Sequence, residues 1–260
     1  MPTLTLHPLM GMPEIRPGED LAALLWRALT AGGLGLVAGD VVVVAQKAVS
    51  KAEGERVPLA EVSPSPLARD WAVRWGRDPR LVELVLRESR RIIRMERGLI
   101  IAETHHGFVC ANAGVDASNV GGEDVALLLP RHPDDSAARL RERLHAAAGL
   151  APEAALGVIV ADSFGRPWRV GLTQAALGCA GLAPLLDYRG KVDRDGRPLH
   201  ATVIAVADQL AGAADLVCGK AEGIPAALIR GYAPPPAAHP EGQAQGGRAL
   251  LRSPEEDLFR

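Results

Sequence analysis

The sequence predicts a mixed α/β or α+β protein in which buried strands lead into polar loops. Two apolar runs, at residues 41–45 and 156–161, are typical of buried strands. Helical patterns occur at 20–30, 66–75 and 78–89. Asp20 and Asp78 stand where N-caps are expected, and Pro79 lies in the first turn of the third helix. Strands and helices do not alternate as repeated βαβ units, and no dinucleotide-binding or Walker motif occurs, so neither a Rossmann nor a P-loop fold is expected.

The remaining elements follow from the same patterns. Residues 91–103 alternate and break at Gly98, which predicts a pair of strands, and 134–148 predict a helix with an acidic first turn. Residues 201–232 predict a strand, a helix, a Gly-rich loop and a strand. The polar stretch at 46–55 is interpreted as a turn. We assign residues 1–232 to the folded region and 233–260 to a Pro/Gly-rich tail with a charged end.

The composition excludes several classes of function. The chain has 260 residues, 48% of them hydrophobic, and a net charge of -2, so it lacks the basic surface that nucleic-acid binding requires. No apolar run approaches the roughly 20 residues that span a bilayer, and no signal peptide is recognisable. We therefore expect a cytoplasmic protein that binds neither nucleic acid nor membrane. The isolated cysteines Cys110, Cys179 and Cys218 are interpreted as small buried side chains.

The use of lysine is unusual. Of 29 basic residues, only Lys47, Lys51, Lys191 and Lys220 are lysine. A compact ammonium group kept in an arginine-rich chain suits a position where a planar guanidinium group would not serve. The pattern therefore points to Lys51 and Lys220 as candidate phosphate-binding residues.

Two carboxylates stand just beyond apolar strands. Asp116 follows FVC (108–110) after a stretch that contains Asn112 and Gly114, and Asp162 directly follows the strand at 156–161. Oxygen-rich sites of this kind suit Mg²⁺ or Mn²⁺ shared with substrate phosphates, and Asn112, Asn119 and Ser163 could complete such a site or hold a nucleotide. The alternative is that both aspartates cap turns through hydrogen bonds to nearby backbone N–H groups.

Arg166 and Arg169 flank Trp168 shortly after Asp162. Two guanidinium groups beside a carboxylate are suited to bidentate capture of a phosphate or carboxylate on a substrate, although surface ion pairing is the simpler explanation. The segment CGKAEGIP (218–225) resembles part of a phosphate loop, but Ala221 follows Lys220 where Ser or Thr would be needed. Any phosphate contact there would come from Lys220 and backbone N–H groups.

Four segments, in order and spacing, resemble the coenzyme F420:L-glutamate ligase family. They are GDVVVVAQKAVSKAEG (39–54), CANAGVDASNV (110–120), VIVADSFGRPWRVGLTQAALG (158–178) and GKAEGIPAALIRG (219–231). The resemblance extends from GMPEI (11–15) to the final EEDLFR. It implies an α+β fold of two closely packed lobes, a homodimer, and a reaction that joins L-glutamate to F420-0 while GTP is hydrolysed with a divalent metal.

The resemblance also implies roles for individual residues. Metal ligands fall on Asp116, Asp162 and Ser163, with Glu222 as a further acidic ligand. Nucleotide contacts fall on Pro13, Glu14, Ile15, Gln46, Lys47, Lys51, Asn119, Gly219, Lys220 and Gly223. From their charge, Arg166 and Arg169 are predicted to hold the anionic F420-0 or the incoming glutamate.

Two other functions are compatible with the same residues. One is a nucleotide-dependent ligase that joins a different carboxylate to a different amine, because related enzymes change the substrate pocket while they keep the phosphate site. The other is a guanine-nucleotide-binding protein without catalysis, in which the metal only orders loops. The number of glutamates added and the choice between Mg²⁺ and Mn²⁺ do not follow from the sequence.

Overall fold

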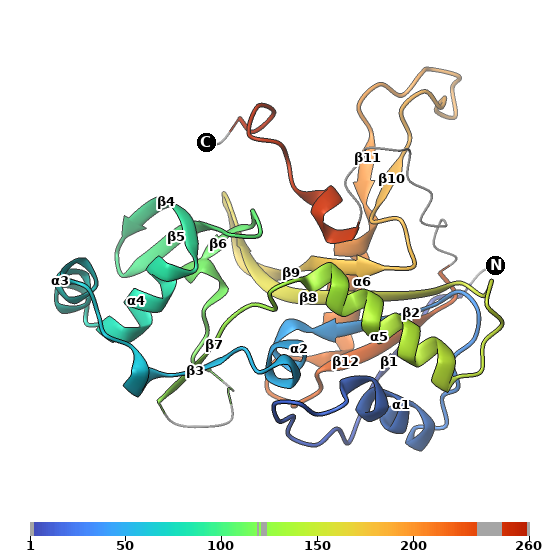
Figure 1. Cartoon of the computed structure of the whole chain (residues 1–260). Helices are drawn as coiled ribbons and strands as arrows, with labels where there is room; N and C mark the ends of the chain where they lie inside the picture. The colour runs from blue at the N-terminus through green and yellow to red at the C-terminus, as the bar shows by residue number, and fades with distance from the viewer. Residues whose placement is uncertain (1–2, 119, 121–123, 233–245, 259–260) are drawn as a thin grey trace.

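The computed structural model describes residues 3–118, 120, 124–232 and 246–258, and its larger lobe is built on one five-stranded sheet (Figure 1). The strand order is β1 (Thr5–Pro8), β12 (Ala226–Arg230), β2 (Asp40–Ala45), β8 (Leu156–Arg166) and β9 (Arg169–Ala180). Only the β2–β8 pair is parallel; the other neighbours are antiparallel. The prediction of a mixed fold outside the Rossmann pattern is confirmed.

Helices cover both faces of this sheet. Val42, Val44, Val158 and Val160 point to one face, where α1 (Leu21–Ala31), α2 (Gln46–Glu53) and α5 (Pro133–Ala147) cover them. The intervening Val41, Val43, Ile159 and Ala161 point to the other face and pack against α6 (Val206–Cys218). Because neighbouring strand residues alternate between faces, runs that are apolar at every position are required in a sheet covered on both sides.

The parallel pair brings several chain ends to one edge of the sheet. Its register runs from Asp40 opposite Leu156 to Ala45 opposite Ala161. The next strand, β12, runs antiparallel to β2 and starts at this edge, where the N–H of Ala45 donates to the carbonyl of Pro225 at 2.7 Å. The end of β2, the middle of β8 and the loop before β12 therefore lie side by side.

The smaller lobe is an insertion between α2 and α5, and Figure 1 shows it beside the larger sheet. It contains β3 (Arg56–Pro58), η1 (Leu59–Glu61), α3 (Pro66–Trp75), α4 (Pro79–Arg87), β4 (Ser89–Glu96), β5 (Leu99–Thr104), β6 (Val109–Ala111), η2 (Asn112–Gly114) and β7 (Val125–Leu127). Strands β4, β5 and β6 form an antiparallel sheet that packs on α3 and α4, and β3 pairs with β7.

A compact apolar cluster joins the two lobes. Phe108 of the smaller lobe packs with Leu129 and with Leu177 of β9, and Phe164 and Leu251 border them. The Phe108 and Phe164 rings meet edge to face, with centroids 6.3 Å apart. Such contacts add to the burial of the rings, so this cluster fixes how the lobes sit relative to one another.

Two further segments complete the described chain. Strands β10 (Leu185–Asp187) and β11 (Val203–Ala205) form a hairpin that projects from the α6 side of the larger lobe (Figure 1). The short helix η3 (Gly246–Leu250) packs on β9, where the N–H of Gly247 donates to Asp134 at 2.6 Å. Part of the predicted tail is thus docked on the larger lobe. Within the described residues, no helix is long and apolar enough to cross a bilayer.

Most predicted helices and strands are confirmed, but two local predictions are wrong. Residues 46–53 form helix α2 instead of a turn. This helix starts directly after β2 without a side-chain cap, so its sequence carries no start signal, yet Ala48 and Val49 are buried in the core. Strand β8 does not stop at Ala161 but continues to Arg166, because β9 pairs along its whole length. Asp162 and Ser163 therefore lie within a strand.

The close approach of β9 to α5 predicts a sharp difference between two glycines. A Cβ atom on Gly178 would lie 2.2 Å from the backbone carbon of Pro133, whereas a Cβ on Gly165, in β8, would meet nothing within 4 Å. We expect Gly178→Ala to lower the free energy of unfolding by about 1–3 kcal/mol, the usual cost of overpacking. Gly165→Ala is the matched control and should leave it nearly unchanged. Urea denaturation measures both, and equal stabilities would contradict the packing described.

Candidate functional site

A cleft of about 730 Å³ lies at the edge of the larger sheet where β2, β8 and the loop before β12 meet. Its walls come from both faces of the sheet: Ala48 and Lys51 belong to α2, and Ala211 and Ala214 belong to α6. The segment after β1 closes a further side. The cleft therefore wraps around the sheet edge between α2 and α6.

Most of the residues predicted to bind nucleotide or metal line this cleft. They are Pro13, Glu14, Ile15, Gln46, Lys47, Lys51, Asp162, Ser163, Gly219, Lys220 and Gly223. Three of the four lysines of the chain are among them; the fourth, Lys191, lies over the ring of Tyr188 in the β10–β11 segment. Asn119 lies outside the described residues.

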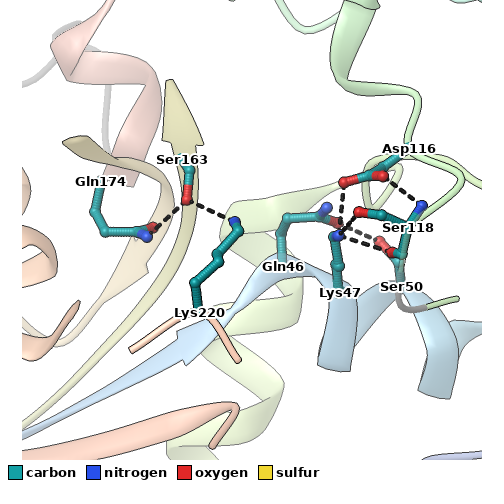
Figure 2. A network of polar contacts seen from close by, with 8 residues as sticks. All are labelled: Gln46, Lys47, Ser50, Asp116, Ser118, Ser163, Gln174 and Lys220. Carbon is teal, nitrogen blue, oxygen red and sulfur yellow. Dashed lines mark hydrogen bonds and ion pairs between the residues drawn. The ribbon is translucent and has the colours of Figure 1, made fainter. Parts of the chain in front are cut away.

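Lys47 connects the two lobes at the cleft. Its ammonium group lies 2.6 Å from a carboxylate oxygen of Asp116 and donates to the carbonyl and hydroxyl oxygens of Ser118, at 2.9 and 3.1 Å (Figure 2). The other carboxylate oxygen of Asp116 accepts from the backbone N–H of Ser118 at 2.6 Å. Burial raises the pKa of Asp116, but the hydrogen bonds from Lys47 and Ser118 outweigh it and hold the pKa below its usual value. Asp116 thus makes the predicted turn contact and still presents charge to the cleft.

A left-handed turn delivers Asp116 to this position. Asn112, Ala113 and Gly114 have φ angles of 51°, 49° and 73°, a conformation that is costly for residues with a Cβ atom. A Cβ on Gly114 would lie 2.6 Å from the side chain of Leu129, so glycine is needed there for space as well as for its φ angle. The side chain of Asn112 accepts from the N–H of Ile100 at 3.3 Å, which makes it part of the turn instead of the cleft.

Asp162 is a carboxylate with little compensation of its charge. Burial raises its pKa, and the negative charge of Asp116 raises it further, while the N–H of Ser163 and the charges of Lys220 and Lys47 oppose the shift. The carboxylate of Asp162 and the hydroxyl of Ser163 in the cleft, with Asp116 held nearby by Lys47, form a donor set that fits a divalent cation. Among the described residues, no three His, Cys, Asp or Glu side chains are grouped so that they alone could hold a metal ion. A cation here would depend on water and substrate oxygens for its remaining ligands.

Ser163 belongs to a second polar network on the α6 side of the sheet. Its hydroxyl oxygen accepts from Gln174 at 2.9 Å and from Lys220 at 3.2 Å (Figure 2). The same amide nitrogen of Gln174 donates to Asp215 at 2.8 Å. Gln174 and Asp215 both line the cleft, and the sequence analysis did not find them. Their meeting depends on the pairing of β9 with β8 and on the packing of α6, which no local pattern reveals.

Polar pairs also order the α2 side. The ammonium group of Lys51, which is only 8% exposed as a residue, donates to Glu14 at 2.6 Å. The hydroxyl of Ser50, the residue before Lys51, donates to the buried side-chain carbonyl of Gln46 one turn earlier in the helix, at 2.9 Å. A buried ammonium group requires such a partner, so Lys51 and Glu14 fix one another at the mouth of the cleft.

Four of the predicted site residues that the structure describes lie outside the cleft lining: Asp116, which contacts it through Lys47, and Glu222, Arg166 and Arg169. Glu222 is exposed, and its carboxylate accepts from the N–H of Ala221 at 2.8 Å within its own loop. Arg166 and Arg169 are exposed at the end of the β8–β9 hairpin, where Arg166 donates to the carbonyl of Val170 at 3.1 Å. The roles predicted for Glu222, Arg166 and Arg169 therefore remain predictions, because the structure places none of these side chains in the cleft lining.

Comparison with known proteins identifies relatives over nearly the whole chain. The model of the family described as F420-0:Gamma-glutamyl ligase matches residues 10–231. A protein of Methanothermobacter thermautotrophicus named coenzyme F420:L-glutamate ligase is 49% identical, over 96% of this chain and 96% of the relative. Proteins of the same name from Methanopyrus kandleri and Methanocaldococcus jannaschii are 44% and 41% identical, over 100% and 85% of this chain and 99% and 85% of the relatives.

The bridge from Lys47 to the Asp116 segment predicts a local change in dynamics. Lys47→Met removes the ion pair and both hydrogen bonds to Ser118 while it keeps a similar side-chain length. We expect peptide amides at 115–118 to exchange hydrogen faster, by about 5-fold or more for the loss of roughly 1 kcal/mol of local stabilisation. Hydrogen-exchange mass spectrometry measures this. Lys51→Met, whose contact is to Glu14, should leave that segment unchanged; an equal effect of both variants would contradict a local bridge.

Proposed function

Because the chain belongs to the F420-0:gamma-glutamyl ligase family, we propose that it joins L-glutamate to coenzyme F420-0 with GTP and a divalent cation, releasing GDP and phosphate. The family model covers 222 of 260 residues, and the three relatives align over 85–100% of this chain, which supports a ligase of coenzyme F420 biosynthesis. The observation that carries the finer proposal is the convergence of Lys47, Lys51, Lys220 and Asp162 on one cleft, with Asp116 held beside it by its ion pair with Lys47.

The proposed reaction has two steps. The γ-phosphoryl group passes from GTP to a carboxylate oxygen of F420-0, so the bond to GDP breaks as the new P–O bond forms. The α-amine of L-glutamate then attacks the acyl carbon; a C–N bond forms, the C–O bond to phosphate breaks, and the amine loses a proton. An acyl phosphate is needed because a free carboxylate is a poor acceptor for an amine.

The residues of the cleft suit the first step. Lys47, Lys51 and Lys220 offer ammonium groups to the phosphate oxygens, on which negative charge gathers during transfer. Asp116, Asp162 and Ser163 would hold the divalent cation, which supplies charge neutralisation on the transferred group. Pro13 to Ile15 and the Gly219–Gly223 loop line the rest of the cleft and are the proposed contacts for the remainder of the nucleotide.

A protein that binds guanine nucleotides without catalysis is a less suitable explanation. Burial raises the pKa of Asp162, so the site keeps a carboxylate where its charge is disfavoured. A disfavoured carboxylate lowers the stability of the fold, and such groups are typical of catalytic sites. This favours a site that transfers a phosphoryl group over one that only binds a nucleotide.

Asp162→Asn tests this proposal because it removes one charge without changing the side-chain shape. Purified protein is incubated with F420-0, GTP, L-glutamate and Mn²⁺ or Mg²⁺, and the deazaflavin product is followed by mass spectrometry. The wild-type protein should add one or more glutamyl units only when GTP is present. The variant should lose about 100-fold or more in rate. Asp70→Asn, an exposed position on α3, is the control and should keep full activity. Glutamylation by Asp162→Asn at the wild-type rate would remove Asp162 from the mechanism.

Arg166 and Arg169 remain the proposed holders of anionic substrate. Their place at the hairpin end requires the acceptor to reach along β8 from the cleft, or a second copy of the chain to approach. The family resemblance supports a homodimer, and Val170 and Leu172, 96% and 65% exposed on the same hairpin, offer it an apolar surface.

Arg169→Ala is expected to raise the Michaelis constant for F420-0 or for L-glutamate by roughly 10-fold, since a charge-assisted hydrogen bond to the substrate is lost. Steady-state kinetics with each substrate varied in turn measures this. The Michaelis constant for GTP should not change. Unchanged constants for both F420-0 and glutamate would show that the charge-based assignment is wrong.

A further inference from the structure

Asp215 presents a carboxylate to the cleft from the last turn of α6. It is partly buried, and one of its oxygens accepts from the side-chain amide of Gln174 at 2.8 Å. Gln174 in turn donates to Ser163 at 2.9 Å from the strand directly opposite, where the two residues are paired across β8 and β9. The carboxylate is therefore held in place by a neutral group that is itself fixed at both ends.

Two other acidic groups around the cleft are ion-paired, and Asp162, which has no ion pair among the described residues, is already assigned to the divalent cation in the proposed function. Glu14 forms an ion pair with Lys51, and Asp116 forms one with Lys47, each at 2.6 Å. In the part of the chain that the structure describes, no Lys, Arg or His nitrogen lies within 4 Å of the Asp215 carboxylate. The nearby Lys220 donates to Ser163 instead. A fixed carboxylate with no cation in a partly dry cleft favours a cationic ligand.

The reactants of the proposed function contain one cationic group. GTP carries phosphates, and F420-0 carries a phosphodiester and a carboxylate, whereas L-glutamate brings an α-ammonium group. We infer that Asp215 binds the α-ammonium group of the amino-acid substrate and that Gln174 positions Asp215 for this contact. The inference rests on the proposed function, because it takes L-glutamate as the amine substrate.

The network gives this assignment a chemical consequence. Gln174 spans from Asp215 to Ser163, so the amine would lie one side chain away from a residue proposed to hold the divalent cation that accompanies the transferred phosphate. The nitrogen that must attack the acyl carbon is thereby held near the end of the cleft where the acyl phosphate forms. An analogue with a hydroxyl group in place of the ammonium group should bind poorly, since it leaves the carboxylate without a cation.

Asp215→Asn is the test, because it removes the charge while its side-chain oxygen still accepts from Gln174. We expect the Michaelis constant for L-glutamate to rise roughly 10- to 100-fold, while those for GTP and F420-0 stay within about twofold. L-2-Hydroxyglutarate is the matched probe. As a competitive inhibitor it should bind the wild-type protein at least about 10-fold more weakly than glutamate binds, and this preference should disappear in the variant. Asp70→Asn should behave as the wild type.

Each outcome decides between distinct explanations. An unchanged Michaelis constant for glutamate in active Asp215→Asn protein overturns the inference, as does equal binding of glutamate and L-2-hydroxyglutarate by the wild type, a comparison that needs no folded variant. If Asp215→Asn needs a higher Mg²⁺ or Mn²⁺ concentration for activity but keeps the wild-type Michaelis constant for glutamate, Asp215 is a metal ligand and the inference is wrong. Calorimetry of L-glutamate binding distinguishes the failure of this inference from that of the proposed function. If glutamate binds the wild type but not Asp215→Asn, and no glutamylated product forms, only the proposed reaction is wrong. If glutamate does not bind the wild-type protein, both proposals are wrong.

Discussion

The register of the one parallel strand pair sets the position of every group at the cleft. With Ala45 opposite Ala161, the first turn of α2 lies beside Asp162 and Ser163, and the antiparallel β12 brings the 219–225 loop to the same edge. A shift of one residue would turn the apolar set of β2 or β8 to the wrong face of a sheet covered on both sides. Packing in the core therefore fixes the register, and the register fixes the site.

Because the cleft lies at a sheet edge, consecutive residues of one strand serve opposite sides of it. Asp162 senses the charges of Lys47 and Asp116, whereas Ser163 pairs with Gln174 on the side of α6. The smaller lobe supplies Asp116 through a left-handed turn that only glycine at position 114 permits. The apolar seam around Phe108 and Leu177 then holds that lobe against the strand that carries Ser163's partner. The packing of the two lobes therefore also determines where Asp116 lies relative to the cleft.

The sequence allowed prediction wherever a local signal existed. The valine run of β2 and the Asp caps of α1 and α4 gave these elements directly. Helix α2 lacked a side-chain cap and was missed, although its residues Lys47 and Lys51 were singled out by their chemistry. Gln174 and Asp215 gave no signal, because a polar residue in a strand and an acid in a helix are each ordinary on a solvated surface. The two residues are 41 positions apart in the chain, and only the packing of α6 on β9 brings them together, so no local motif could reveal their contact.

The charge balance of the cleft explains why such a site would need a cation to accept a nucleotide. Among its described lining residues, Lys47, Lys51 and Lys220 are balanced by Glu14, Asp162 and Asp215, and Asp116 adds a further negative charge through its contact with Lys47. A triphosphate entering this cleft meets no net positive field, and two of the lysines are already paired. A divalent cation between the carboxylates and the phosphates would reverse that balance and free Lys47 to turn toward the ligand. Under the proposed function, these carboxylates would repel an unaccompanied nucleotide and would favour one that arrives with its metal over other anions.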